Sequence, residues 1–350
     1  MKLAITADVH LKTEKEVPER YNALRDILRQ CAAEGITTLV ICGDLFDHDF
    51  SNYADFEKLC AAHAGIQFWL LPGNHDAGLS SRNLTGKNIE VFSQAATREV
   101  DGRQLLFLPY KPDSQMGEQL AEFSDRLAAG KWVLFSHGDY LQGRHTAHES
   151  EEGSYMPLTR DDLQRYHLSR VFLGHIHAAS ESDAGVIYPG SPCGLDISET
   201  GSRHYYIYDT GSGNHVSRQV QTDVVYGSLA LMVLPVDDEA ARAASEVKNW
   251  LVTSGLAEQK KKACLRVKVA GYCRDRSALL KAVEDELAGY RKYDSTGVDI
   301  SELSTTIDPQ RSDIAEKARA EISAMGLVDG PNEPDVNQVL QQALKVIFEG

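Results

Sequence analysis

Residues 38–47 read Thr38-Leu39-Val40-Ile41-Cys42-Gly43-Asp44-Leu45-Phe46-Asp47, a short apolar run followed by a glycine and an aspartate. The run has the length and β-branched content of a buried strand, and patterns with helical periodicity lie before it at 20–34 and after it at 53–64. A strand between helices is typical of a parallel sheet with helices on its faces. In such sheets the loops that follow the strands meet at one edge, where ligands bind.

Other short β-forming runs extend this pattern along the first 210 residues, at 3–6, 67–71, 104–108, 132–135, 170–173, 185–188 and 204–208. The later runs are joined by shorter links, which indicates a mixed sheet or a second sheet packed on the first. We therefore predict an α/β fold for this part of the chain.

The pattern changes near Tyr226. An alternating strand at 228–235 precedes a helix at 237–253, a strand at 264–271, a helix at 274–290 and a last strand near 297–300. Two helices follow, at 313–325 and 335–348, separated by a breaker at 326–331. The expected organisation is a catalytic domain at 1–225, a small α+β domain at 226–303 and a helical segment at 304–350.

Charge and cysteine usage limit the possible functions. The net charge of −15 over 350 residues argues against nucleic-acid binding through the whole surface. Residues 226–303 are neutral, with 12 Lys+Arg against 12 Asp+Glu, and contain Lys260, Lys261 and Lys262. No apolar run is long enough to span a membrane, the start of the chain has no signal-peptide pattern, and the six cysteines are scattered. These features predict a cytoplasmic protein with reduced thiols.

Metal-ligand residue types follow five of the predicted strands. They are Asp8 and His10, then Asp44, then Asn74, His75 and Asp76, then His137, and finally His175 and His177. Oxygen and imidazole ligands without thiolates favour manganese, iron, zinc or magnesium. A carboxylate such as Asp44 can bridge two ions about 3.5–4 Å apart, and such a pair activates water and clamps phosphate oxygens.

Each motif taken alone also has a simpler explanation. Asp-x-His and Gly-Asp are common in turns, and Asn74 or Asp76 could cap a helix. His175 and His177 could be structural residues on one face of a strand. We expect His145 and His148, in the polar stretch 143–153, to be solvated rather than ligands. Five motifs in this order, each after an apolar run, make a coincidence improbable.

This series of motifs resembles the signature of the calcineurin-like metallophosphoesterases over about residues 1–210. Within that superfamily the chain resembles an SbcD-type DNA-repair nuclease, on the segments 6–11, 43–47 and 188–192 and on the small domain with its helical tail. The resemblance implies a sandwich of two mixed β-sheets flanked by helices, a small α+β cap domain and a C-terminal helical pair. It also implies DNA as the substrate, a homodimer, and an SbcC-type coiled-coil ATPase as the partner.

Residue roles are carried over position by position. The resemblance implies that Asp8, His10 and His177 hold one divalent ion. It implies that Asn74, His137 and His175 hold a second ion and that Asp44 bridges the two, with Mn2+ expected and Mg2+ the alternative. His75 would act on the transition state or the leaving 3′ oxygen, with Asp76 orienting it. We expect Lys260, Lys261 and Lys262 to grip nucleic acid, helped by Arg266, Arg274 and Arg276.

Two other functions remain open from the sequence. One is a different phosphoesterase: a protein phosphatase, a cyclic-nucleotide phosphodiesterase or a small-phosphoester hydrolase. Many such protein phosphatases carry Arg-Gly after the Gly-Asp loop, where this chain has His48-Asp49, and Asn-His-Glu where it has Asn-His-Asp. The second is an inactive DNA-end-binding scaffold, which is disfavoured because every expected ligand is present.

The two C-terminal helices each carry an apolar stripe. The predicted stripes are Ile314, Ala318, Ile322 and Met325 on the first, and Val336, Val339, Leu340, Ala343, Leu344 and Ile347 on the second. Packing on the chain's own catalytic domain would cover them, but helix-in-groove docking also suits such stripes. The family resemblance implies that the groove belongs to the ATPase.

Overall fold

Most of the short apolar runs form strands of two packed sheets in a computed structural model that describes residues 1–126, 132–141, 155–306, 308–325 and 336–349. The chain divides into two compact units, one of residues 1–195 and 202–223 and one of residues 196–201 and 224–350. The predicted functional division at residues 225 and 303 stays a prediction.

The first sheet of the first unit has the order β14-β13-β1-β2-β3-β4. Its strands are β1 (Lys2–Thr6), β2 (Thr38–Cys42), β3 (Gln67–Leu71), β4 (Ile89–Val91), β13 (His204–Asp209) and β14 (His215–Gln219). Strands β1 to β4 are parallel, while β13 is antiparallel to β1 and β14 to β13. The carboxyl ends of β1, β2 and β3 therefore lie at the same edge.

The second sheet has the order β11-β12-β10-β7-β6-β5. Its strands are β5 (Ala96–Val100), β6 (Arg103–Phe107), β7 (Trp132–His137), β10 (Arg170–Gly174), β11 (Ser180–Glu181) and β12 (Val186–Tyr188). The four central strands are parallel, and β5 and β11 are antiparallel at the two edges. A separate short pair joins β8 (Tyr140–Leu141) to β9 (Leu158–Thr159).

Buried apolar side chains fill the space between the two sheets. Leu3 and Val40 of the first sheet belong to the same core cluster as Phe107, Phe135 and Phe172 of the second. The three phenyl rings stack, with centroids 5.1 and 5.4 Å apart. Each such side chain contributes about 1.5–3 kcal/mol by its burial. This core holds the two sheets face to face.

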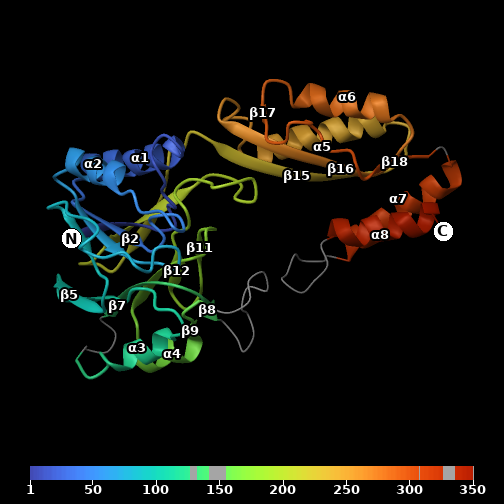
Figure 1. The fold of residues 1–350 in the computed structure, drawn as a ribbon. Helices are drawn as coiled ribbons and strands as arrows, with labels where there is room; N and C mark the ends of the chain where they lie inside the picture. Colours follow the sequence, from blue (N-terminus) through green and yellow to red (C-terminus); the bar gives the residue numbers. More distant parts are fainter. Residues whose placement is uncertain (127–131, 142–154, 307, 326–335, 350) are drawn as a thin grey trace. The chain divides into compact units, whose positions relative to one another are not determined.

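Helices lie on the outside of this sandwich (Figure 1). They are α1 (Pro18–Glu34) and α2 (Ala54–Ala62) beside the first sheet, and α3 (Met116–Ala121) and α4 (Arg160–Tyr166) beside the second. A second core, including Leu120 of α3 and Leu163 of α4, covers the outer face of the second sheet. The predicted sandwich of two mixed sheets flanked by helices is confirmed.

The second unit is built on a parallel four-stranded sheet of β15 (Val225–Val233), β16 (Ala263–Cys273), β17 (Arg291–Lys292) and β18 (Leu303–Thr305). Helices α5 (Glu239–Thr253) and α6 (Arg276–Glu286) connect successive strands. Val247 of α5 and Val283 of α6 share a buried cluster with Leu231 and Val267 of the sheet. The predicted α+β unit therefore has its own core.

Helices α7 (Pro309–Ala324) and α8 (Val336–Glu349) complete the second unit. Asp308 caps α7 by accepting hydrogen bonds from the amides of Gln310 and Arg311, at 3.0 and 3.1 Å. On α8, Leu340 and Leu344 are buried against Leu234 and Tyr272 of the same unit. No helix within the described ranges combines the length and apolarity that a bilayer crossing needs.

The predicted apolar stripe on the first C-terminal helix is confirmed at Ile322 and wrong at its two ends. Ile314 is 53% exposed and Met325 67% exposed, while Ser312, Ala315 and Ile322 are buried. Ala315 and Ile322 share a buried cluster with Leu340 and Leu344 of α8, so the inner face of α7 includes Ala315 and the larger Ile314 faces outward.

Candidate metal centre

The loops after β1 and β2 are held together by backbone hydrogen bonds. The amide of Asp8 donates to the Gly43 carbonyl at 3.1 Å, and the amide of His10 to the Asp44 carbonyl at 3.0 Å. The loops after β3 and β10 are tied in by side chains: the His75 amide donates to Asp44 Oδ1, and the His175 amide to Asp8 Oδ1, each at 2.8 Å. The predicted ligand loops therefore form one connected structure.

Two glycines allow the sheets to approach each other at this edge. A Cβ on Gly174 would lie 1.9 Å from the Cys42 carbonyl oxygen, and a Cβ on Gly43 would lie 2.1 Å from His137 Nδ1. Both distances are far inside van der Waals contact. The loops after β7 and β10 reach the loop after β2 only because these positions lack side chains.

Four of the predicted ligands have a left-handed backbone. The φ angles are 54° at Asp8, 51° at His10, 50° at Asp44 and 101° at His175. Positive φ is uncommon outside glycine, and such conformations cost on the order of 1–3 kcal/mol each and cluster at active sites. Strand β10 ends at Gly174, so His175 and His177 lie in a loop and not on one face of a strand.

Three of the predicted ligands form the first group. Asp8, His10 and His177 each offer an atom within 4.8 Å of the others. The Nε2 atoms of His10 and His177 are 3.2 Å apart, so the two rings point toward a common position. The carboxylate and the two imidazoles thus come together from the loops after β1 and β10.

Three more predicted ligands form a second group, in which His137 and His175 meet at the side chain of Asn74. Its Oδ1 lies 2.7 Å from His137 Nε2 and 3.3 Å from His175 Nδ1. Asp44 lies between the two groups, with Oδ2 at 3.4 Å from His137 Nε2 and 3.8 Å from His10 Nε2. The structure therefore brings together all seven residues predicted to bind metal.

The chemistry of these side chains fits divalent cations. Asp8 is fully buried, and its Oδ2 has no hydrogen-bond partner among the described residues. Burial raises the pKa of Asp8 to about 6, and the neighbouring charge of Asp44 adds to the rise. A buried carboxylate oxygen without a partner is costly, and a cation satisfies it. The oxygen and imidazole donors suit hard or borderline divalent ions.

Protonation in the site follows from the buried carboxylates. Burial alone would raise the pKa of Asp44, but the facing imidazoles of His137 and His10 outweigh it and lower that pKa. Burial opposes protonation of His137, yet the Asp44 carboxylate raises the pKa of His137 to about 9. Burial lowers the pKa of His10 to about 4, which keeps this imidazole in the neutral form that binds metal.

The partners of the second nitrogen in three of the imidazole rings were not predicted from the sequence. His137 Nδ1 lies 3.0 Å from the Cys42 carbonyl, His175 Nε2 lies 3.5 Å from Asp139 Oδ1, and His10 Nδ1 lies 3.8 Å from Asp47 Oδ1. Partners of this kind orient a metal-binding ring and select its tautomer. The sequence does show the two carboxylates, since Asp139 comes two residues after His137 and Asp47 three residues after Asp44.

The His75 ring and the Asp76 carboxylate contact different partners. Nδ1 of His75 is 3.5 Å from Asp47 Oδ1, and Asp47 Oδ2 is 3.2 Å from Lys12 Nζ. Asp76 instead accepts hydrogen bonds from the amides of Gly73 and Phe46, at 2.7 and 3.1 Å. Both Asp76 oxygens thus bind backbone amides, one in its own turn and one in the loop after β2, and the carboxylate that faces His75 is that of Asp47. His75 also forms a possible ligand group with His10 and Asp44.

The predicted nucleic-acid residues lie in the second unit, between α5 and β16. Lys260 and Lys261 are exposed, and Lys260 Nζ lies 4.8 Å from the centre of the Tyr290 ring. Lys262 is half-buried, and its carbonyl accepts a hydrogen bond from Val225. His145 and His148, expected to be solvated, lie outside the described residues.

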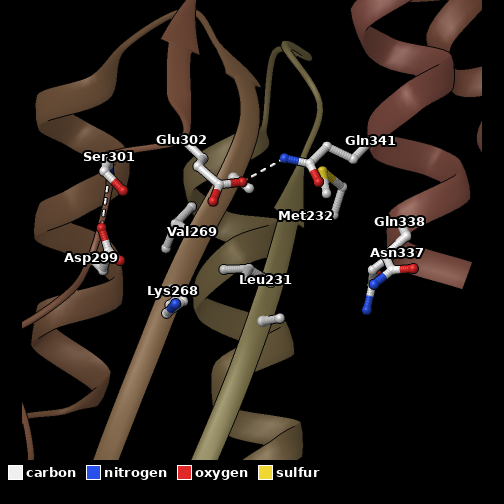
Figure 2. A pocket seen from close by; sticks show the side chains of 12 residues that line it. Leu231, Met232, Lys268, Val269, Asp299, Ser301, Glu302, Asn337, Gln338 and Gln341 are labelled. Atoms are coloured by element: carbon white, nitrogen blue, oxygen red, sulfur yellow. Dashed lines mark hydrogen bonds between the residues drawn. The ribbon is translucent and has the colours of Figure 1, made fainter. Parts of the chain in front are cut away.

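A cavity of about 190 Å³ opens on the second unit, between its sheet and α8 (Figure 2). Its polar side chains include Lys268, Asp299, Ser301, Glu302, Asn337, Gln338 and Gln341. The acidic ones are engaged locally, because Asp299 accepts from the Ser301 amide and Glu302 from the Gln341 side chain. Every metal-ligand group found among the described residues lies in the first unit, so we place the chemistry there.

Comparisons with known proteins agree with this placement. A family model described as calcineurin-like phosphoesterase matches residues 1–179. An uncharacterized metallophosphoesterase of Bacillus subtilis, YhaO, is 27% identical over 234 residues, which cover 61% of this chain and 55% of that protein. The chain thus spans about half the length of this curated relative.

Two solved structures are also similar. A chain from a study of a novel archaeal phosphodiesterase is 16% identical with a TM-score of 0.35, and the match covers 63% of this chain and 100% of that one. A second is 14% identical with a TM-score of 0.42, over 63% of this chain and 99% of that one.

Replacing Asp44 tests the metal centre. Wild-type protein should gain thermal stability on addition of Mn2+, by about 2.7 kcal/mol at a concentration 100 times the dissociation constant, because the ion binds only the native state. The Asp44→Ala variant should lose nearly all of this gain, because Asp44 faces both ligand groups. Thermal unfolding with and without Mn2+, and a count of bound ions, measure the effect. Asp161→Ala, at an exposed position of α4, is the control. Unchanged Mn2+ binding by Asp44→Ala would contradict the assignment.

Proposed function

Since the chain belongs to the calcineurin-like phosphoesterase family, we propose that it is the nuclease subunit of an SbcCD-like complex and hydrolyses phosphodiester bonds in DNA. The observation that carries the proposal is the meeting of Asp8, Asp44, Asn74 and the four ligand histidines at one edge of the sandwich. The metal-dependent phosphoesterase activity follows from the family. The DNA substrate and the exonuclease or endonuclease action are the proposal.

One feature of the chain argues against a protein phosphatase and another against a small phosphoester. His48 and Asp49 stand where many related protein phosphatases carry Arg-Gly, directly after the segment 43–47 that resembles the SbcD-type nucleases. The second unit adds a surface that a small substrate would not need. Residues 226–303 carry 12 basic and 12 acidic side chains, so the net charge of this segment is zero. The rest of the chain is acidic, and this segment is therefore the part that repels phosphate groups least.

Seven side chains would hold two divalent ions, for which we propose Mn2+, with Mg2+ as the alternative. Asp8, His10 and His177 would bind one ion, and Asn74, His137 and His175 the other, with Asp44 between them. When bound, such ions supply Lewis-acid stabilisation of the phosphate oxygens and activate water. Backbone hydrogen bonds from His75 to Asp44 and from His175 to Asp8 tie the loops that carry these donors to one another.

His75 is the side chain that we assign to the leaving group. As water attacks phosphorus and the bond to the 3′ oxygen breaks, His75 donates a proton to that oxygen. The ring edge lies against His10, with centroids 4.6 Å apart, and Asp47 faces its Nδ1. We therefore propose that Asp47, itself paired with Lys12, orients the ring. Asp76 fixes the Asn74-His75 turn through backbone amides.

Replacing His75 tests both the substrate and this role. His75→Asn should lower cleavage of DNA by about 10²- to 10⁴-fold, the usual contribution of a positioned acid or base, while two Mn2+ ions stay bound. Plasmid DNA and 3′-labelled duplex with Mn2+ provide the assay, run beside p-nitrophenyl phosphate. His167→Asn is the control, because His167 is exposed and its left-handed backbone tolerates asparagine. Wild-type hydrolysis of p-nitrophenyl phosphate without any DNA cleavage would overturn the proposed substrate.

We propose that Lys260, Lys261 and Lys262 grip the DNA backbone. Lys260 and Lys261 are exposed, whereas Arg266 and Arg274, which the sequence suggested as helpers, are paired with Asp294 and Asp237. The three lysines therefore supply the more available positive charge. A solvated lysine turn without a ligand is the competing explanation.

Charge reversal separates these two explanations. Changing Lys260, Lys261 and Lys262 to Glu should weaken DNA binding and flatten its salt dependence, by about one unit of slope for each phosphate that is no longer neutralised by a lysine. Binding across a salt series measures the slope, and Lys248→Glu on α5, also exposed, is the control. A slope equal to that of the wild type would assign the lysines to the solvated surface.

The outer faces of α7 and α8 support the proposed ATPase partner. The inner face of α8 is used within the second unit, where Leu340 and Leu344 pack against Tyr272. Large apolar side chains nevertheless point outward on both helices, at Ile314, Met325 and Val346. We propose that an SbcC-type coiled-coil ATPase covers them, that the assembly contains a dimer of this subunit, and that it works in the cytoplasm. The six cysteines are buried and scattered along the chain, which is consistent with reduced thiols.

Substitution on this outer face tests the partner better than deleting the helices, which would uncover Tyr272 and Leu234. Val346 is 71% exposed, so Val346→Asp should leave the fold intact. It should weaken ATPase binding by about 2 kcal/mol or more, roughly 30-fold, if the site is an interface hot spot. Copurification with the ATPase is the measurement. Val252→Asp on α5, 62% exposed, is the matched control. Equal copurification of both variants would place the partner's binding surface elsewhere.

A further inference from the structure

The ring of His175 has a different neighbour at each nitrogen. Nδ1 lies 3.3 Å from Asn74 Oδ1 and so faces the ligand group. Nε2 points the other way and lies 3.5 Å from Asp139 Oδ1. His137 has the opposite arrangement, with Nε2 toward Asn74 and Nδ1 toward the Cys42 carbonyl. On the side away from Asn74, His175 therefore faces the Asp139 carboxylate, while His137 has the Cys42 carbonyl at 3.0 Å and the Asp8 carboxylate farther away, at 3.9 Å.

Asp139 is held firmly in the position from which it faces this ring. It is buried, its amide donates to the Tyr155 carbonyl at 2.8 Å, and its own carbonyl accepts from Leu158 at 2.8 Å. Its Oδ2 accepts a hydrogen bond from the Tyr155 amide at 2.7 Å. With the backbone and one oxygen fixed, Oδ1 is directed toward His175.

The preceding residue explains how the carboxylate reaches the imidazole. Gly138 has a φ of 147°, and a Cβ there would lie 2.3 Å from the Tyr155 carbonyl oxygen. Its amide donates to the Gly174 carbonyl at 3.2 Å, which extends the pairing of β7 with β10 beyond the end of β7. The pairing of β7 with β10 thus continues up to the ligand loops and places Asp139 next to His175.

We propose that Asp139 is a positioning residue for His175 and strengthens metal binding by the group of Asn74, His137 and His175, an inference that rests on the proposed two-metal centre. A neutral imidazole carries one proton, and the nitrogen that binds a metal must be free of it. A carboxylate beside Nε2 accepts a hydrogen bond from the Nε2–H group, which favours the tautomer in which Nδ1 is the ligand atom. The distance of 3.5 Å is longer than a formed hydrogen bond, so the proposed contact requires the two groups to approach by a few tenths of an ångström.

A neighbouring aromatic ring limits how far His175 can turn. The Tyr155 ring lies 4.7 Å from the His175 ring, centre to centre, at an interplanar angle of 39°. Because Asp139 also binds the Tyr155 backbone, one carboxylate secures both the edge and the face of the imidazole. Without the carboxylate, the ring could take the tautomer that cannot bind through Nδ1.

The test is Asp139→Asn, which keeps the shape and an oxygen for the Tyr155 amide but presents a donor to Nε2. Titration of the full-length, chelator-treated protein with Mn2+ alone should show two ions in the wild type. In the variant, one of the two sites should bind about 10- to 100-fold more weakly, and the other should be unchanged. The maximal rate of hydrolysis should recover at saturating Mn2+, because no reacting group is removed.

Asp26→Asn is the matched control, because Asp26 is also buried and also accepts a backbone amide, from Gln221 at 2.8 Å. If the wild type binds two Mn2+ ions and Asp139→Asn binds both with wild-type affinities, the inference about Asp139 is wrong. A wild type that binds fewer than two ions contradicts the two-metal centre itself. Should Asp139→Asn fail to fold, Asp139→Glu is titrated in the same way. That variant displaces the carboxylate by one methylene, and unchanged affinity at both sites would again overturn the inference.

Discussion

The burial of Asp8 close to Asp44 is the constraint on which the rest of the first unit depends. Two carboxylates removed from water are unfavourable unless positive charge accompanies them. Here imidazoles surround the pair, the pKa of His137 rises to about 9, and that of Asp8 still rises to about 6. The imidazoles thus leave part of the carboxylate charge uncompensated. Divalent cations complete the balance, so the site is stable in the form in which it is proposed to act.

Holding these carboxylates in place sets conditions on the backbone. The glycines at positions 43 and 174 permit close approaches that a methyl group would block, and Asp8, Asp44 and His175 accept left-handed conformations. Such strain persists only where the surrounding structure fixes the chain, and the stacked phenylalanine core between the sheets provides that rigidity. The second unit has a separate core and no comparable strained ligand cluster among its described residues.

The ligand loops could be predicted from the sequence because each signal is local: an apolar strand followed by a residue of the right type. The positions of Asp47 and Asp139 beside the imidazoles, on which their proposed roles rest, could not be predicted, because they depend on which ring nitrogen faces which way. The buried face of α7 was mispredicted in part for a similar reason. Periodicity favoured Ile314 and Ile322, and of these only Ile322 is buried, together with the small Ser312 and Ala315. Properties set by one strand and its loop are thus readable from sequence, and those set by the mutual fit of elements are not.

The two imidazoles around Asn74 differ in what lies behind them, and this difference has a chemical consequence. Nδ1 of His137 lies 3.0 Å from the Cys42 carbonyl, whereas Nε2 of His175 lies 3.5 Å from the Asp139 carboxylate. A carboxylate acceptor makes the opposite ring nitrogen a better electron donor than a carbonyl acceptor does. His137 already has carboxylates near both of its nitrogens, with Asp44 Oδ2 3.4 Å from Nε2 and Asp8 Oδ1 3.9 Å from Nδ1, and Asp139 gives His175 a carboxylate neighbour as well. In the proposed metal centre Asp8 and Asp44 would themselves be ligands, whereas Asp139 would act only through His175.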